Sequence, residues 1–177
     1  MKKLGFSVLA LAATLCLPAV ASAADDNADR THWVHGGMQF RFANGSMFGL
    51  NLGYQFRLPI SGDDHSLILG GRFHINFPTG TTLFGPGLDA GYRGNFVHAQ
   101  PYRAGLIAMA QPSFMFGSSF TSIYIPVVAG GFFKYGNFEA QATIGGGPAI
   151  TSVSVGPVSA SSTDFQGTFG LNAGYAF

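Results

Sequence analysis

The chain has 177 residues, of which 47% are hydrophobic and only 10% charged, whereas about a quarter of the residues of an ordinary soluble domain are charged. This balance excludes a typical water-soluble surface, and the 26 glycines argue against long helices. Beyond residue 24, no segment has the roughly 20 consecutive apolar residues that a membrane helix needs. A membrane protein without helices must be a closed barrel, because only closure pairs every backbone group in lipid.

The N-terminus has the pattern of a secretory signal. Lys2 and Lys3 precede an apolar run over residues 4–20, and Ala21, Ser22 and Ala23 form the small-x-small pattern at which signal peptidase cuts. We therefore predict three parts of the chain: a cleaved signal peptide at 1–23, a flexible lead-in at 24–31 and a barrel at 32–177.

Cysteine and charge content exclude several kinds of site. The only cysteine, Cys16, lies in the signal, so the mature chain has no disulfide and no cysteine metal ligand. Without Lys2 and Lys3, seven of the nine basic residues remain against eight acidic ones. This near-neutral chain has no basic stripe that would indicate a nucleic-acid partner.

Eight segments show the alternation of apolar and polar residues that is typical of barrel strands. In chain order they are 33–42, 48–58, 67–77, 84–92, 102–116, 123–133, 138–144 and 165–177. In the second, the outward residues are all apolar and the inward ones are glycine or polar. A water-soluble barrel would have the reverse arrangement. In the sixth, both faces are apolar and Pro126 predicts a bulge or an interruption.

The remaining segments are expected to connect the strands. Asn44-Gly45 is a tight hairpin signal, residues 59–65 and 93–101 are read as connections, and a turn is predicted at 134–137. Residues 145–147 are expected to end the regular part of the seventh strand. The serine-rich stretch at 151–163 is predicted to be the longest loop.

The last segment carries the most specific signal in the chain. Phe165, Phe169, Leu171, Tyr175 and Phe177 share one face of the predicted strand, and the chain stops on the aromatic residue. This ending resembles the C-terminal signature of the small bacterial outer-membrane β-barrel family.

The resemblance implies an all-β, antiparallel transmembrane barrel, with eight strands as the first choice and ten as the next. It also implies Sec-type export to the outer membrane of a Gram-negative bacterium. The expected partners are outer-membrane lipid and the barrel-assembly machinery, which would act through the C-terminal strand. The insertion signal would consist of Phe169, Leu171, Tyr175 and Phe177. As the closing strand, 165–177 would pair with 33–42, so that the sheet has no free edge.

Eight strands place both chain ends on one side, which is the periplasm in this family. Aromatic residues would then gather at both rims as girdles at headgroup level. The periplasmic girdle would hold Trp33, Phe56, Tyr92, Tyr102, Phe133, Phe138, Tyr175 and Phe177. The outer girdle would hold Phe42, Phe48, Phe77, Phe84, Phe114 and Phe165.

Charged residues gather at inward positions or strand ends. The predicted lumen network is Arg41, Arg57, Arg72, Asp89, Arg93, Arg103 and Glu139. Buried charges must be paired, so arginine forks on the two carboxylates predict a structural plug. The excess of arginine alternatively indicates a narrow passage for anions. The inward glycines would make room for arginine side chains or widen that passage; they are Gly49, Gly53, Gly70, Gly87, Gly91, Gly105, Gly170 and Gly174.

The sequence contains no motif for a catalytic, cofactor or metal site. Lipid A deacylase barrels carry His-x-Ser near the C-terminus, but this chain has no histidine after His98. His65 and Ser66 are adjacent, so their side chains would point to opposite faces of a strand. We therefore expect a non-enzymatic envelope protein with a structural or loop-mediated role and no cofactor. The alternatives are a narrow porin-like channel for small solutes such as anions and a lipid-modifying outer-membrane enzyme; the oligomeric state stays open.

Overall fold

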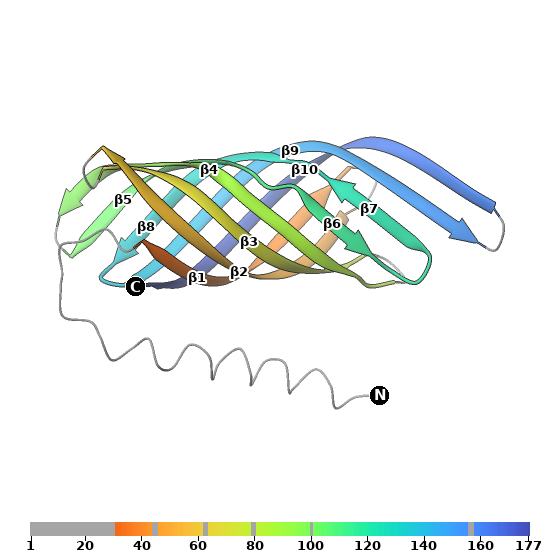
Figure 1. Ribbon diagram of the computed structural model, residues 1–177, viewed down its shortest axis with the longest axis horizontal. Coiled ribbons are helices and arrows are strands. Elements are labelled where there is room, and N and C mark those ends of the chain that lie inside the picture. The colour runs from red at the N-terminus through yellow and green to blue at the C-terminus, as the bar shows by residue number, and fades with distance from the viewer. Residues whose placement is uncertain (1–30, 44–45, 62–63, 79–80, 100, 156–157) are drawn as a thin grey trace, which may run out of the picture.

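The computed structural model describes residues 31–43, 46–61, 64–78, 81–99, 101–155 and 158–177 (Figure 1). In these ranges no helix is long and apolar enough to cross a membrane. The predicted signal peptide and most of the predicted lead-in lie outside the described residues. The strands are β1 His32–Phe42, β2 Ser46–Ser61, β3 His65–Phe77, β4 Leu83–Ala99, β5 Tyr102–Ala110, β6 Ser113–Phe116, β7 Phe120–Tyr124, β8 Val127–Tyr135, β9 Phe138–Val155 and β10 Val158–Ala176.

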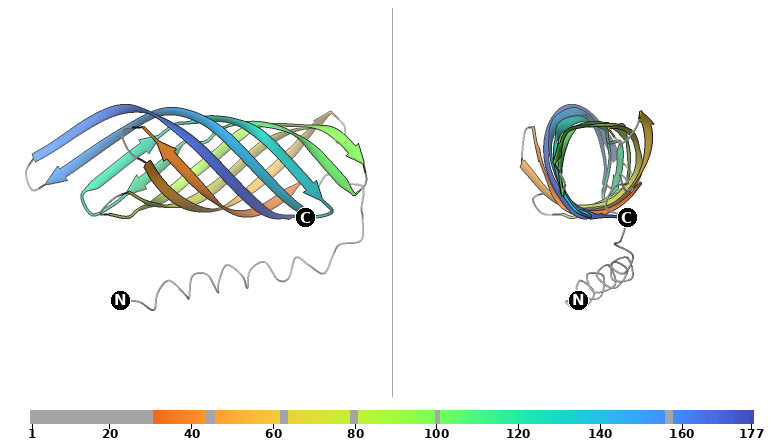
Figure 2. Two further views of the ribbon diagram at one scale, coloured as in Figure 1. Left: turned by 180° about the vertical axis from the view of Figure 1, so that it is seen from behind. Right: turned by 90° about the vertical axis from the view of Figure 1, so that its left-hand side faces the viewer.

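These strands close into a ring. Neighbours pair antiparallel in the order β1, β2, β3, β4, β5, β8, β9 and β10, and β10 returns to β1. The end-on view in Figure 2 shows this closed wall. The closing pair runs from Trp33 opposite Ala176 to Phe42 opposite Gly167, so the last strand meets the first as the sequence predicted.

Prolines explain why ten strand segments make an eight-membered ring. Pro112 separates β5 from β6, and Pro126 separates β7 from β8; a proline has no N–H with which to continue a ladder. Pairing bridges both breaks, because Leu88 N donates to Pro112 O and Gln111 N donates to Pro126 O. The sequence predicted the interruption at Pro126 and missed the one at Pro112.

Side chains alternate between the two faces of the wall. The burial of β3 reads in turn buried and exposed from Ser66 onward, with a break at Gly70 and Gly71. Exposed positions carry large apolar residues on every strand of the ring. Of the Asp, Glu, Lys and Arg residues in the described part of the chain, only Asp64 and Asp164 are exposed. The exterior is thus apolar, as predicted from the second segment, whereas the interior combines the polar and charged side chains with two apolar clusters.

We call the rim that carries His32 and Phe177 the terminal rim, and the opposite one the far rim. The connections at the terminal rim are shorter than predicted. β2 reaches Ser61, β3 begins at His65, and β4 continues to Ala99, so the predicted connections at 59–65 and 93–101 were wrong. Their residues pair as strand, with register shifts near Ser61 and Val97. Irregular pairing at strand ends blurs the alternation that the sequence prediction relies on.

Of the serine-rich stretch that was predicted to be the longest loop, residues 151–155 and 158–163 are strand, and 145–147 do not end the seventh predicted strand. Both belong to a long hairpin in which β9 and β10 pair without a break from Tyr175 opposite Phe138 to Val158 opposite Val155. The hairpin projects beyond the rest of the far rim (Figure 1). Most of the described residues in this ribbon are exposed on both faces. Neither face needs large apolar side chains, so the sequence lacks the alternation of apolar and polar residues that indicates a strand.

Two adjacent glycines show how tightly the strands coil. On Gly130 a Cβ atom would lie 1.9 Å from the Ala142 carbonyl oxygen of β9, closer than any atom can come. On Gly131 the nearest atom to a Cβ would be the Gly105 carbonyl oxygen at 3.6 Å, an ordinary contact. Gly130 therefore allows a close approach of two strand backbones, the use of glycine that strong curvature requires.

Candidate functional site: the barrel lumen

Three charged side chains meet across the bore near the terminal rim: Glu139, Arg57 and Arg93. We call this group the crossbar, and Glu139 is its centre. It comes from β9, and its side chain is fully buried. Arg57 of β2 grips it with two hydrogen bonds, from Nη1 to Oε2 at 2.9 Å and from Nη2 to Oε1 at 2.7 Å. Arg93 of β4 approaches Oε2 at 3.3 Å. Three strands that are not neighbours in the ring are thus tied together through the bore.

Further contacts hold the crossbar in place. Gln141 donates to Glu139 Oε1 at 2.9 Å. The Arg57 guanidinium lies 5.1 Å from the centre of the Trp33 ring, and that of Arg93 lies 3.8 Å from the Phe132 ring. These are cation–π distances, and such contacts gain strength where water is excluded. The two arginines therefore have both a carboxylate and an aromatic partner.

A second charged group lies on β3 and β4. Arg72 Nη2 contacts Asp89 Oδ2 at 2.6 Å, and Gln55 Nε2 of β2 donates to the same oxygen at 2.9 Å. Gln55 reaches Asp89 across Gly70, where a Cβ would lie 3.0 Å from the Gln55 Cγ. The inward glycine allows two side chains of non-adjacent strands to meet.

Arg41 lies toward the far rim in different surroundings. Its guanidinium stands 4.2 Å from the centre of the Tyr124 ring and is 3.4 Å from both the Ser113 Oγ and the Met115 sulfur. Arg41 therefore packs against an aromatic ring and polar side chains of other strands, as do the arginines near the terminal rim.

Of the seven predicted network residues, all but Arg103 are buried; Arg103 is half-buried near the terminal rim. Sequence reasoning missed Lys134, which was placed in a turn. It is buried in β8 directly opposite Glu139. Its inward parity relative to Phe132 was the signal that could have found it.

Apolar side chains fill much of the remaining lumen. One cluster consists of Ile68, Ile107, Met109, Val128 and Phe132, and a second, toward the far rim, of Leu83, Met115, Tyr124 and Ala149. The predicted inward glycines lie under large neighbours, but these are mostly not arginines. A Cβ on Gly53 would meet His35 at 2.5 Å, and one on Gly105 would meet Phe132 at 2.7 Å.

Trp33 corrects the predicted periplasmic girdle. It is fully buried and stacks on His35 with ring centres 4.1 Å apart. Its neighbour Val34 has the outward parity, so Trp33 points into the bore. Trp33 packs against Arg57 of the crossbar and does not face lipid. The other predicted girdle residues are exposed or half-buried at their rims.

The histidines do not form a metal site in the described ranges, where no group of three or more His, Cys, Asp or Glu could hold an ion. His35 and His74 are buried in the lumen. At the terminal rim His32 stacks on Phe177, and His65 contacts the Tyr92 hydroxyl. Ser66 is buried while His65 is only half-buried, so the pair does not combine into a nucleophile and a base.

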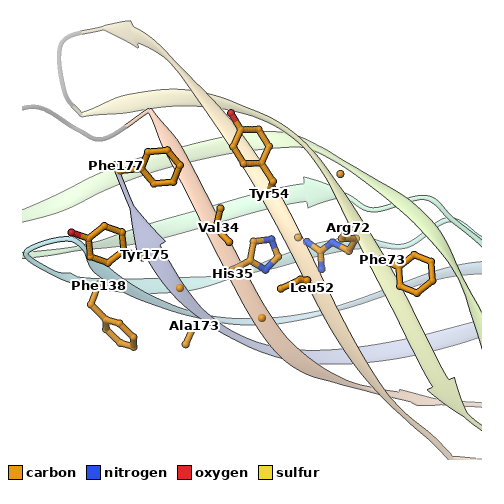
Figure 3. Close-up of a pocket in the computed structure, with 14 residues that line it drawn as sticks. Val34, His35, Leu52, Tyr54, Arg72, Phe73, Phe138, Ala173, Tyr175 and Phe177 are labelled. Carbon is orange, nitrogen blue, oxygen red and sulfur yellow. The ribbon is translucent and has the colours of Figure 1, made fainter. Parts of the chain in front are cut away.

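The exterior wall carries a hollow of about 680 Å³ near the terminal rim (Figure 3). It lies where Gly36 and Gly71 leave gaps between larger outward residues such as Leu52, Tyr54 and Phe73. The outward lining residues are apolar or aromatic. Arg72, which also borders it, is engaged by Asp89 in the lumen. The hollow therefore offers packing to apolar chains and brings no reactive group together.

Comparisons with known proteins match the fold and nothing narrower. No family model and no curated protein matches the chain. Among solved structures, Neisserial surface protein A matches with a TM-score of 0.52 and 15% identity, over 83% of this chain and 97% of the other. The outer-membrane protein AlkL matches with a TM-score of 0.49 and 9% identity, over 88% and 94% of the two chains. Ail of Yersinia pestis matches with a TM-score of 0.45 and 16% identity, over 82% and 97%. The likeness to the Neisserial protein shows a shared fold.

Proposed function

We propose that this chain, which has the fold of the small bacterial outer-membrane β-barrels, is a non-enzymatic protein of a Gram-negative outer membrane that acts through its structure and its far-side surface. The terminal rim would face the periplasm and the far rim the exterior. Outer-membrane lipid would contact the apolar wall, and the assembly machinery would contact β10.

The observation that carries the proposal is the crossbar on Glu139. Arg57 and Arg93 reach it from the opposite side of the ring, so the bore is crossed by charged groups that hold one another. In a low-dielectric interior a buried ion pair is strongly held, because each ion left alone would lack compensation of its charge. A solute that passed this level would have to separate these ions. The structure therefore supports a closed lumen better than an open one.

Planar-bilayer recording of the refolded protein tests this proposal. We expect no stepwise currents from the wild type, because the crossbar and two apolar clusters, around Phe132 and Tyr124, together fill the bore. Regular stepwise currents from the wild type would refute the closed-lumen proposal.

A narrow channel for anions is the second candidate, and one observation favours it. Buried basic residues outnumber buried acidic ones in the described lumen: Arg41, Arg57, Arg72, Arg93 and Lys134 against Asp89 and Glu139. Such an excess would favour anions in a passage of low dielectric constant. Swelling of liposomes loaded with the protein separates the candidates, because selective entry of anionic solutes requires a channel.

We also propose that the protein does not modify lipid. The support is the separation of His65 from Ser66 on the two faces of β3 and the absence of a grouped nucleophile and base among the residues discussed above. Mass spectrometry of lipid A from cells with and without the protein tests this. A mass difference that depends on expression would favour the enzymatic alternative.

A further inference from the structure

The half of β10 toward the far rim, residues 158–166, has a neighbouring strand on one side only. β10 pairs with β9 over its length from Val158 to Tyr175, but with β1 only from Gly167 onward, because β1 ends at Phe42. Figure 1 shows this part of β10 in the hairpin that projects past the other strands. Residues 158–166 therefore form a free strand edge in the described part of the far side, here called the β10 edge.

The hydrogen bonds near the terminal rim reveal which residues point to this open side. Phe177 exchanges backbone bonds with His32 of β1, whereas Ala176 N donates to Asn137 O on the β9 side. In an antiparallel ladder, residues two apart point the same way. The pairing with β9 contains no register shift, so the odd-numbered positions keep facing away from β9. In the described part of the chain, the N–H and C=O groups with no strand beside them thus belong to Ser159, Ser161, Thr163 and Phe165.

This edge lacks the features that usually protect an exposed strand. Natural edges are blocked by lysine, proline or bulges that prevent pairing with other chains. Residues 158–166 contain no lysine and no proline, and their regular register with β9 leaves no bulge. Asp164 is their only charged residue, and Ser159 to Phe165 are all exposed. The edge is long, uncharged in its upper part and open to pairing.

Neither the described part of this chain nor the β10 edge of a second copy supplies the matching strand. β1 ends at Phe42 and β2 starts at Ser46, so β1 does not extend along the edge. A second copy in the same membrane has its β10 running in the same direction, toward the terminal rim. It therefore cannot offer the antiparallel ladder that β10 makes with β1 and β9.

We propose that the β10 edge binds an extended segment of another polypeptide, which adds to the sheet as an antiparallel strand outside the membrane. Backbone bonds to Ser159, Ser161, Thr163 and Phe165 would supply the affinity, as in other cases of strand addition. Asp164 selects for a basic side chain opposite it, because opposite charges on facing strands stabilise the pair. The partner is thus an extended segment that carries one Lys or Arg and is otherwise uncharged, and β-branched residues would favour its strand conformation. The proposal rests on the proposed function for the side of the membrane that the edge faces.

The test uses the refolded full mature chain and a short synthetic peptide of alternating Thr and Val with one Lys placed opposite Asp164. Amide hydrogen exchange is followed by NMR. We expect saturable binding and at least about tenfold slower exchange at Ser159, Ser161, Thr163 and Phe165. The amides of the even-numbered positions already bond to β9 and should not change.

Two matched double variants separate backbone pairing from side-chain contact. S161P/T163P removes two N–H donors of the open edge, because proline has no N–H. No bond to β9 is broken, since the N–H groups of these two positions point away from β9. We expect its peptide affinity to fall about tenfold. S161A/T163A keeps the donors and should bind as the wild type does. Asp164→Asn should remove the preference for the Lys peptide over a matched Glu peptide.

Several outcomes would overturn the proposal. They are the absence of saturable binding to the wild type, protection spread equally over odd and even amides, and equal affinity in S161P/T163P. Slowed exchange that appears with protein concentration alone would identify a second copy as the occupant. Conductance of the same preparation is recorded in parallel. A conducting barrel that still binds the peptide refutes the closed lumen only, and a closed barrel without peptide binding refutes this inference only.

Discussion

Replacing Glu139 by Gln is the sharpest test of the crossbar. The change keeps the shape of the side chain and removes its charge. The amide oxygen can still accept one hydrogen bond, but the fork of Arg57 then meets an N–H₂ group where it had met an oxygen. Arg57 and Arg93 would remain buried near one another without their carboxylate.

The size of the effect follows from these contacts. Removing one partner of a buried ion pair costs about 3–5 kcal/mol, since a charge is left uncompensated. Two hydrogen bonds from Arg57 and the approach of Arg93 at 3.3 Å are affected, while one acceptor survives. We expect the free energy of unfolding to fall by about 3 kcal/mol, which is more than a hundredfold in the folding equilibrium.

Urea unfolding in lipid vesicles measures this change, with the fluorescence of Trp33 as the signal. Trp33 is the only tryptophan in the chain, and its ring lies 5.1 Å from the Arg57 guanidinium. Asp164→Asn is the control, because Asp164 is an exposed carboxylate on the same pair of strands and should change stability by less than about 0.5 kcal/mol. If Glu139→Gln unfolds at the same urea concentration as the control, the crossbar does not hold the lumen together.

Three further predictions concern the wall and its closure. Gly130→Ala should prevent or strongly destabilise folding, since its Cβ would lie 1.9 Å from the Ala142 carbonyl oxygen, whereas Gly131→Ala should leave the heat-modifiable band on gels unchanged; equal behaviour of the two would contradict the close approach. Brominated lipids should not quench Trp33, which is buried in the bore, and strong quenching would return it to the lipid girdle. Deleting Phe177 should reduce outer-membrane insertion more than it changes the lumen, and an unchanged amount of folded barrel in the deletion strain would contradict this.

The sequence predicted the barrel, its closing pair and the inward face of most strands. It succeeded in segments such as 48–58, where lipid on one side and packed polar groups on the other impose a period of two. It failed where that contrast is lost. Trp33 has an apolar ring that fits a lipid girdle equally well, and only its place beside His35 and Arg57 shows that it fills the bore.

The pairing inside the lumen could not be predicted in detail. Parity places Arg57, Arg93 and Glu139 inward, but it does not say which carboxylate each arginine reaches, since that depends on how far the strands shift past one another. The extended hairpin was missed for a similar reason. Residues 151–163 stand outside the apolar layer, so a strand there needs no alternating pattern.

The crossbar also bears on the order in which the chain folds. Arg57 and Glu139 are 82 residues apart, and Gln39 donates to Thr168 across 129 residues where the first strand meets the last. Contacts at such separations form late, after the entropy of the intervening chain has been lost. The guanidinium groups must therefore enter the membrane region still hydrated, inside a sheet that has not yet closed. The final pairing of β1 with β10 is then also the step that removes water from the bore. The rate of closure therefore includes the release of water from the guanidinium and carboxylate groups.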